Sequence, residues 1–231
     1  MSSYARLRSS ALELFASRGF QATGIRDLAA GAGLSLATLY HYMDRKEDLL
    51  VRLMRESLVR LNTDARLVLA QVGSPVQRLA ALTLLHVLAH GLRRTETVVV
   101  DRELRSLDEE NRAAVVALRD EYEELWARQL AEGTASHTMS VPDTRVARLA
   151  LLEMCTGVAY WYSDNGPLGL DEVAVVHADL VLAQVQARQG AERVSLADLD
   201  LPPVAWFRDL VTREEAGHDE TGRENAGRRE H

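Results

Sequence analysis

The chain has 231 residues and a formal net charge of −7, so it can bury a real core but is too acidic for a general nucleic-acid coat. Its single cysteine, Cys155, excludes an intramolecular disulfide and any multi-cysteine zinc site, and its apolar neighbours predict a buried thiol. The sequence has no long apolar run, and its N-terminus lacks a separate hydrophobic segment with a cleavage site. We therefore expect a cytoplasmic protein without a membrane span or signal peptide.

The charge is distributed unevenly along the chain. Residues 1–50 carry a net charge of +1, so the remaining 181 residues carry −8. A nearly neutral N-terminal segment followed by an acidic remainder fits a protein that contacts phosphate at one end only.

Residues 21–50 predict two short helices, a tight turn between them and a longer third helix. Thr23 is a natural N-cap for the first helix, and Gly31 and Gly33 are expected to end it, because glycine tolerates the left-handed conformation of a sharp turn. Ser35 can cap the second helix, 36–42, in which Leu39 faces inward. This spacing is typical of a helix-turn-helix in which the second helix enters the major groove of DNA. An ordinary corner between two helices is the structural alternative.

The second helix presents small, hydroxyl-bearing and aromatic side chains, which allow close approach and reach phosphates and base edges. Lys46, the only lysine, stands at the start of the following helix, where backbone amides can also face a phosphate. The expected contacts with double-stranded operator DNA are Thr23, Gly24, Ser35, Leu36, Ala37, Thr38, Tyr40, His41, Tyr42 and Lys46.

The segment from residue 11 to residue 50 resembles the TetR family of bacterial transcription regulators. The matching residues are Ala11, Leu14, Phe15, Gly19, Phe20, Thr23, Ile25, Ala29, Gly33, Ser35, Thr38, Leu39, Tyr40, Tyr42, Lys46 and Leu49. Leu28 replaces the usual isoleucine, Ala37 a frequent glycine and Tyr42 a frequent phenylalanine. The resemblance implies a DNA-binding domain over 1–48 and a ligand-binding and dimerisation domain behind it.

The rest of the chain reads as helices separated by helix-breaking residues, so the predicted fold class is all-α. We expect a helical bundle over 49–213, no strands, and a disordered tail over 214–231. Thr95, Asp108 and Asp171 are expected caps, Pro142 and Asp143 start a further helix, and Gly133 is expected to close one. The expected helices are 45–72, 75–93, 95–106, 109–132, 142–163, 171–189 and a weaker one at 203–213.

Helices 142–163 and 171–189 have outer faces too apolar for solvent. The resemblance implies that these two helices pair with their copies in a homodimer, although packing against their own bundle is the alternative. Two recognition helices must also reach half-sites about 34 Å apart on DNA, which favours a dimer. The expected interface residues are Val146, Leu149, Glu153, Gly157, Val173, Val176, Leu180 and Ala183.

The resemblance also implies a cavity for a small-molecule effector between the helices of the body. Candidate lining residues are large or polar side chains on otherwise apolar faces, and the aromatic ones among them could equally belong to the core. His86 and His90 have the i, i+4 spacing of two metal ligands, but no third ligand lies near them in sequence, so no metal or cofactor is expected. The candidates are His86, His90, Arg102, Arg105, Arg119, Tyr122, Trp126, Met154, Tyr160 and Trp161.

Two segments, RDEYEELW (119–126) and LLEMCTGVAYWYSDNGPLGLDEVA (151–174), are similar to a subgroup of TetR-type repressors that respond to acyl-CoA thioesters. Thr156 stands where asparagine is frequent in that subgroup. A CoA thioester needs an apolar slot and cations for its phosphates, and Arg102, Arg105, Arg119 and Arg128 are available.

The sequence therefore predicts a ligand-responsive repressor of catabolic genes. One alternative is a TetR-like repressor of an efflux system that senses hydrophobic or cationic drugs, which a buried unpaired carboxylate would favour. A remote alternative is an α-helical enzyme, but the chain has no Walker loop, Gly-x-Ser-x-Gly elbow or metal-ligand set.

Overall fold

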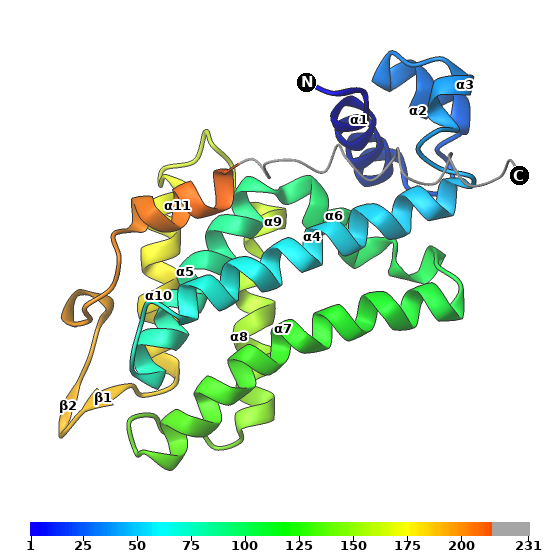
Figure 1. Cartoon of the computed structure of the whole chain (residues 1–231). Helices are drawn as coiled ribbons and strands as arrows, with labels where there is room; N and C mark the ends of the chain where they lie inside the picture. The colour runs from blue at the N-terminus through cyan, green and yellow to red at the C-terminus, as the bar shows by residue number, and fades with distance from the viewer. Residues whose placement is uncertain (214–231) are drawn as a thin grey trace, which may run out of the picture.

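A computed structural model describes residues 1–213, and the predicted tail at 214–231 lies outside the described residues. Three helices form a head at one end, and a long helix leads from it into a body of packed helices (Figure 1). The head contains α1 (Ser3–Arg18), α2 (Ile25–Ala32) and α3 (Leu36–Leu39). The body follows with α4 (Lys46–Leu69), α5 (Pro75–Leu92), α6 (Arg94–Arg102), a 3-10 turn (Leu104–Ser106), α7 (Glu109–Ala135), α8 (Thr144–Thr156), α9 (Val158–Trp161) and α10 (Leu170–Gln184).

After α10 the chain forms a short hairpin, so the expectation of no strands was wrong. Strands β1 (Arg188–Gln189) and β2 (Glu192–Arg193) pair antiparallel, with Gly190 at a φ of +64° in the turn between them. This polar segment has no helical periodicity, so its backbone groups pair across a turn instead. A 3-10 turn (Leu196–Asp198) and α11 (Val204–Thr212) complete the described chain.

Several predicted helix ends differ from the structure. Gly24 rather than Thr23 is the N-cap of α2, and Gly169 rather than Asp171 is the N-cap of α10. The cap expected at Thr95 is instead at Arg93. In both glycine-capped helices a carboxylate three residues later accepts a hydrogen bond from the cap amide, which is the reciprocal bond of a capping box.

Two glycines expected to end helices lie inside them. A Cβ on Gly31 would lie 2.2 Å from Ser10 Oγ, so this glycine lets α1 and α2 approach closely. Helix α7 continues past Gly133 to Ala135. A Cβ at this position would lie 2.5 Å from Met139 Sδ, so only glycine leaves room for that side chain. Both glycines are therefore explained by packing rather than by helix termination.

The buried residues form two clusters that α4 connects. The first half of α4, with Leu49, Leu53 and Leu58, packs into the core of the head together with Val99 of α6 and Val115 of α7. The second half packs into the core of the body around α5, which is buried on nearly all sides. The predicted boundary at residue 48 therefore falls at the start of a helix that both cores share. Within residues 1–213, no helix is both long and apolar enough to cross a bilayer.

Candidate operator-binding and effector sites

The turn between α2 and α3 has the predicted helix-turn-helix geometry. Gly33 has a φ of 63° and a ψ of 39°, the left-handed conformation, and Leu34 N donates to Ala29 O at 2.9 Å. Ser35 Oγ accepts a hydrogen bond from Thr38 N at 3.0 Å and caps α3 as predicted. Leu39 is fully buried and fixes this helix on the head.

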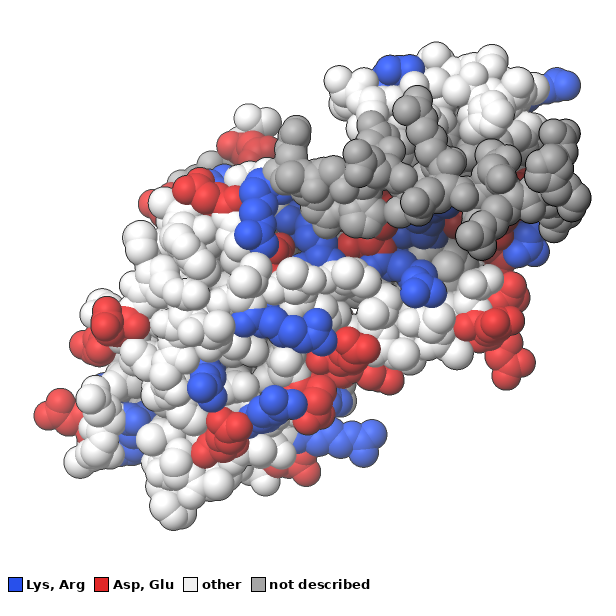
Figure 2. Space-filling model, viewed as in Figure 1, with Lys and Arg blue, Asp and Glu red and all other residues white. Residues whose placement is uncertain are grey.

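The exposed face of α3 and the following turn presents five of the expected DNA contacts. Tyr40 is 50 % exposed, and Thr38 is half-buried beside this face. On the face of the head that Figure 2 shows uncovered, most residues are uncharged and a few are basic. The five exposed residues are Ser35, Leu36, Ala37, Tyr40 and His41.

The other expected contacts have different surroundings. Thr23 is buried, and its hydroxyl donates to Gly19 O at 2.9 Å. Tyr42 is half-buried, with its ring 5.8 Å from that of Tyr4. Gly24 is exposed at the start of α2.

Lys46 holds the head together from the start of α4. Its Nζ donates to Phe20 O at 2.7 Å and to Thr23 O at 2.8 Å, and it lies 4.2 Å from the centroid of the Phe20 ring. Partial burial lowers the pKa of Lys46, while the nearby Glu103 carboxylate opposes this shift. Two of the three ammonium donors are thus used within the protein, which is a structural role that the sequence did not suggest.

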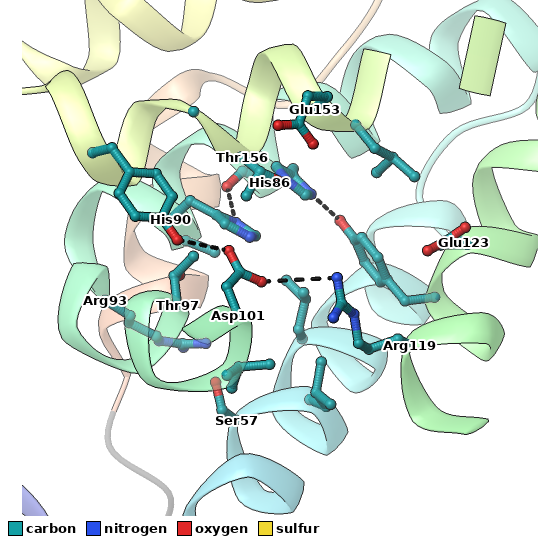
Figure 3. A pocket seen from close by; sticks show the side chains of 18 of the residues that line it. Ser57, His86, His90, Arg93, Thr97, Asp101, Arg119, Glu123, Glu153 and Thr156 are labelled. Atoms are coloured by element: carbon teal, nitrogen blue, oxygen red, sulfur yellow. Dashed lines mark hydrogen bonds and ion pairs between the residues drawn. The ribbon is translucent and has the colours of Figure 1, made fainter. Parts of the chain in front are cut away.

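The body contains a cavity of about 510 Å³ between α4 and the helices α5 to α9 (Figure 3). Five of the predicted effector residues line it, namely His86, His90, Arg119, Tyr122 and Tyr160. Apolar residues from α4, α5, α6 and α8 form much of the remaining wall, among them Leu58, Leu61, Ala89, Val100 and Leu152.

The other five predicted effector residues lie outside the cavity lining. Trp126 is fully buried behind His86, with its ring edge-on at 5.6 Å, and Met154 packs against the body core. Trp161 is exposed and stacks on His177. Arg105 is exposed, whereas Arg102 lies with its guanidinium carbon 5.4 Å from the ring centroid of Tyr160, beside the cavity.

The list of candidates from the sequence left out several polar residues of the cavity wall, although Glu123 and Thr156 lie within the two segments that resemble the acyl-CoA subgroup. The omitted residues are Ser57 of α4, Arg93 and the α6 residues Thr97 and Asp101, together with Glu123 of α7 and Thr156 of α8. Three residues predicted for the dimer interface, Leu149, Glu153 and Gly157, also line the cavity.

The two histidines stack in the cavity wall with ring centroids 3.7 Å apart. His86 Nδ1 lies 3.0 Å from the Tyr122 hydroxyl, and His86 Nε2 lies 3.0 Å from the Thr156 hydroxyl. His90 Nδ1 lies 2.8 Å from the carbonyl oxygen of His86. Burial lowers the pKa of His90 to about 4 and that of His86 well below its ordinary value, so both rings are neutral at pH 7.

Among residues 1–213, Asp101 is one of three carboxylates in the cavity wall. The other two are Glu123, which pairs with Arg148, and Glu153, which is exposed. Tyr160 Oη donates to Asp101 Oδ2 at 3.1 Å, and Arg119 Nη2 lies 3.8 Å from Asp101 Oδ1. Burial raises the pKa of Asp101, against the opposing effects of Arg119 and Tyr160. Since it already has a cation and a hydroxyl beside it, Asp101 is not the unpaired carboxylate that a cationic drug would need.

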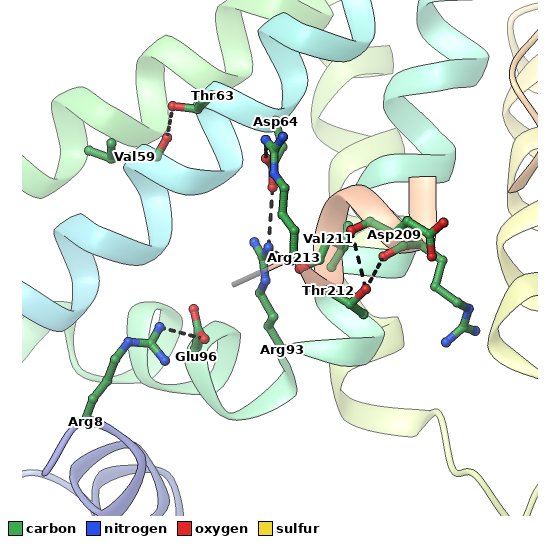
Figure 4. A network of polar contacts seen from close by, with 11 residues as sticks. Arg8, Val59, Thr63, Asp64, Arg93, Glu96, Asp209, Val211, Thr212 and Arg213 are labelled. Atoms are coloured by element: carbon green, nitrogen blue, oxygen red, sulfur yellow. Dashed lines mark hydrogen bonds and ion pairs between the residues drawn. The ribbon is translucent and has the colours of Figure 1, made fainter. Parts of the chain in front are cut away.

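Helix α6 joins the cavity to the head. Thr97, Val100 and Asp101 line the cavity, whereas Glu96 forms an ion pair with Arg8 of α1 at 2.7 Å (Figure 4). Just beyond α6, the buried Glu103 carboxylate accepts a hydrogen bond from Phe20 N at 3.1 Å.

A second polar network fastens the C-terminal end of the described chain to α4. The buried Asp64 pairs with Arg93 at 3.4 Å and with Arg213 at 2.9 Å (Figure 4). Arg93 also donates to Val211 O and lines the cavity. The segment after α10 therefore contacts the helix that leads to the head.

The predicted dimer face is exposed along α8 and α10, with one exception. Val146 is 63 % exposed, and Leu149, Val176 and Leu180 are each close to half exposed. Glu153 and Ala183 are also exposed, and Gly157 is half-buried. Val173 was wrongly placed on this face: it is only 3 % exposed, because it points into the core of its own body.

Comparison with known proteins gives the family of this fold and site. Residues 7–53 match the family described as bacterial regulatory proteins, tetR family, and residues 72–185 match the tetracyclin repressor-like C-terminal domain. The transcriptional repressor KstR2 of Mycolicibacterium smegmatis is 29 % identical over 183 residues, which are 78 % of this chain and 89 % of KstR2.

Solved structures agree with this assignment. The regulator PfmR from Thermus thermophilus is 31 % identical with a TM-score of 0.70, over 81 % of this chain and all of PfmR. AibR, in a complex with isovaleryl coenzyme A and operator DNA, is 22 % identical with a TM-score of 0.70, over 78 % of this chain and 97 % of AibR, and shares the fold. A helix-turn-helix head on a helical body defines a DNA-binding regulator rather than an enzyme. The chain belongs to the TetR family of DNA-binding transcriptional repressors.

Proposed function

We propose that this TetR-family repressor binds its operator as a homodimer and that an acyl-CoA, or a related lipid-type effector, releases it to allow expression of catabolic genes. The observation that carries the proposal is the cavity of about 510 Å³ whose wall includes Ser57, Leu58 and Leu61 of α4. The same helix begins at Lys46, which is bonded to the head. A ligand in the cavity therefore contacts the helix that carries the DNA-binding unit.

The lining of the cavity suits an acyl group, and the residues beside the cavity suit the phosphates of CoA. Leu58, Leu61 and Val100 offer an apolar slot, which favours a hydrocarbon chain or ring. The exposed Arg102 lies over the ring of Tyr160, itself a lining residue, so a cation is available beside the cavity for a phosphate. AibR, which shares the fold, was crystallised with isovaleryl coenzyme A and operator DNA, and this precedent supports the effector class.

The exposed apolar stripe on α8 and α10 supports the homodimer. Val146, Leu149, Val176 and Leu180 would each be an unfavourable exposed side chain in a monomer, and a second copy of the chain would cover them. A dimer also gives two copies of α3 the fixed spacing that successive major grooves require.

The mechanism we infer is a shift between two conformations of the dimer. An effector can move this equilibrium only if it binds one conformation more tightly than the other. Binding that displaces α4 would change the distance between the two recognition helices and thereby lower operator affinity.

The test is a titration of the protein–operator complex with acyl-CoAs of different length. The operator is first obtained by selecting bound fragments from genomic DNA. The corresponding free acids and free CoA serve as matched controls, because each carries only one part of the effector. Release by at least one thioester at concentrations where its free acid and CoA are inactive supports the proposal, and failure of every thioester overturns it.

A further inference from the structure

His90 carries a hydrogen-bond acceptor that faces the effector cavity. Its Nδ1 lies 2.8 Å from the main-chain carbonyl oxygen of His86, which can only accept, so Nδ1 holds the proton. In the neutral ring, Nε2 then has a free lone pair and no hydrogen. Burial keeps the ring neutral by lowering the pKa of His90 to about 4.

The neighbouring His86 does not share this property. Hydroxyl groups of Tyr122 and Thr156 engage both of its ring nitrogens, each at 3.0 Å. Among the side chains of residues 1–213, none is hydrogen-bonded to His90 Nε2, although His90 lines the cavity and is 91 % buried. The acceptor is therefore available to a ligand and to water, but it is shielded from bulk solvent.

A saturated acyl chain would exclude water from this nitrogen without replacing its hydrogen bond. Leaving a buried acceptor unpaired is costly, whereas a hydroxyl on the ligand would satisfy it. A ketone would not, because it has no hydrogen to donate. Among the carboxylates of the cavity wall, Asp101 is already occupied by Tyr160 and Arg119, and Glu123 pairs with Arg148. The third, Glu153, is exposed, so water can satisfy it when no ligand hydroxyl does.

We propose that His90 Nε2 accepts a hydrogen bond from a hydroxyl group on the acyl part of the effector, so that the cavity selects hydroxylated acyl groups over saturated ones. This inference rests on the proposed function in taking the effector to be a thioester. The cavity volume of about 510 Å³ lies within the range of roughly 300–1,000 Å³ that is usual for small-molecule pockets, so a ten-carbon acyl group is a suitable probe.

The experiment compares decanoyl-CoA with 3-, 5- and 10-hydroxydecanoyl-CoA, which place the hydroxyl at different distances from the thioester. Calorimetry measures binding to the protein, and fluorescence anisotropy measures release of the operator. We expect at least one hydroxylated isomer to bind about tenfold more tightly than decanoyl-CoA. The ketone 3-oxodecanoyl-CoA should bind no better than decanoyl-CoA.

His90→Phe tests the acceptor directly, because phenylalanine keeps a flat ring against His86 and removes Nε2. His90→Gln restores a polar group with an oxygen acceptor and should recover part of the preference. His177→Phe is the matched control: His177 is also buried and its Nδ1 lies 2.8 Å from the carbonyl of Val173, four residues earlier, but it does not line the cavity. Thermal unfolding of each variant checks that it folds.

A preference that is lost in His90→Phe but kept in His177→Phe supports the inference. Equal affinity of the wild type for decanoyl-CoA and every hydroxylated isomer overturns it and leaves the proposed function intact. A preference that persists in His90→Phe also overturns it, since another group then recognises the hydroxyl. If no thioester releases the operator, the proposed function fails. Calorimetry with decanoic and 10-hydroxydecanoic acids then decides the inference by the same comparison of variants.

Discussion

Lys46→Met should weaken operator binding by loosening the head rather than by removing a phosphate contact. Methionine retains an unbranched apolar stem beside Phe20 but removes the ammonium group that donates to Phe20 O and Thr23 O. The turn between α1 and α2 then loses its attachment to α4. We expect lower operator affinity at every salt concentration, together with lower stability of the protein.

The size of the effect follows from the two lost bonds. A hydrogen bond to a charged group contributes about 1.5–3 kcal/mol when it is well buried. Lys46 is only partly buried, so we take about 1 kcal/mol for each bond and about 2 kcal/mol in total. For a chain of this size, that corresponds to a decrease of about 4–8 °C in the midpoint of thermal unfolding.

The salt dependence of operator affinity separates the two roles. Each phosphate contact contributes about 0.9 to the slope of log affinity against log salt, so a dimer that loses one contact per subunit loses about 1.8. We expect anisotropy titrations to give an unchanged slope for Lys46→Met. Arg26→Met removes an exposed cation from α2 and controls for the change in charge. A slope reduced by about 1.8 at unchanged thermal stability would refute the structural role of Lys46.

Four further predictions test the body. Leu180→Arg should shift the protein from dimer to monomer in sedimentation analysis, whereas Val59→Arg, at a similarly exposed site on α4, should not. Glu96→Gln removes the ion pair between α6 and Arg8 of α1. We expect the effector to lower operator affinity several-fold less in this variant than in the wild type, while calorimetry gives the same effector affinity for both. Asp64→Asn leaves nearby arginines without their carboxylate and should cost about 3 kcal/mol in urea unfolding; an effect below about 1 kcal/mol would contradict the buried network. The pKa of His90 is about 4 in the folded protein and about 6.5 in the unfolded chain. The free energy of unfolding should therefore be highest above pH 6.5 and should decline by about 1.4 kcal/mol per pH unit toward pH 4, because the unfolded chain takes up the proton first. His90→Phe should show a shallower decline in urea midpoints over this range.

The parts of the fold that could be predicted from sequence depend on local chemistry. Ser35 caps α3 and Gly33 adopts the left-handed turn conformation, because both properties belong to the residue itself and its nearest neighbours. Gly31 and Gly133 were wrongly expected to end helices. Each is a glycine because a neighbouring side chain, Ser10 or Met139, occupies the place where its Cβ would lie. Such a packing requirement is invisible in a periodic pattern, and a glycine inside a helix then looks like a helix end.

The cavity could be predicted only in part, for a related reason. His86, His90 and Tyr122 are polar or aromatic groups on an apolar background, and this contrast is visible in sequence. Asp101 sits in a helix with charged residues around it, so nothing marks it as a lining residue until α6 is packed against α4 and α9. Trp126 was expected to line the cavity but is fully buried in the core, because a large aromatic side chain is equally compatible with either position.

Two helices of the cavity wall are connected to Phe20 of the head, α4 through Lys46 and α6 through Glu103, which directly follows it. Phe20 O accepts a hydrogen bond from Lys46 at the start of α4, and Phe20 N donates to Glu103 just beyond α6. A ligand that moves α4 and α6 apart cannot preserve both bonds without turning the segment between α1 and α2. Since α2 packs on α1 and α3 packs on α2, such a turn would reorient the recognition helix. In the proposed mechanism, Phe20 therefore transmits a displacement of the cavity wall to the recognition helix.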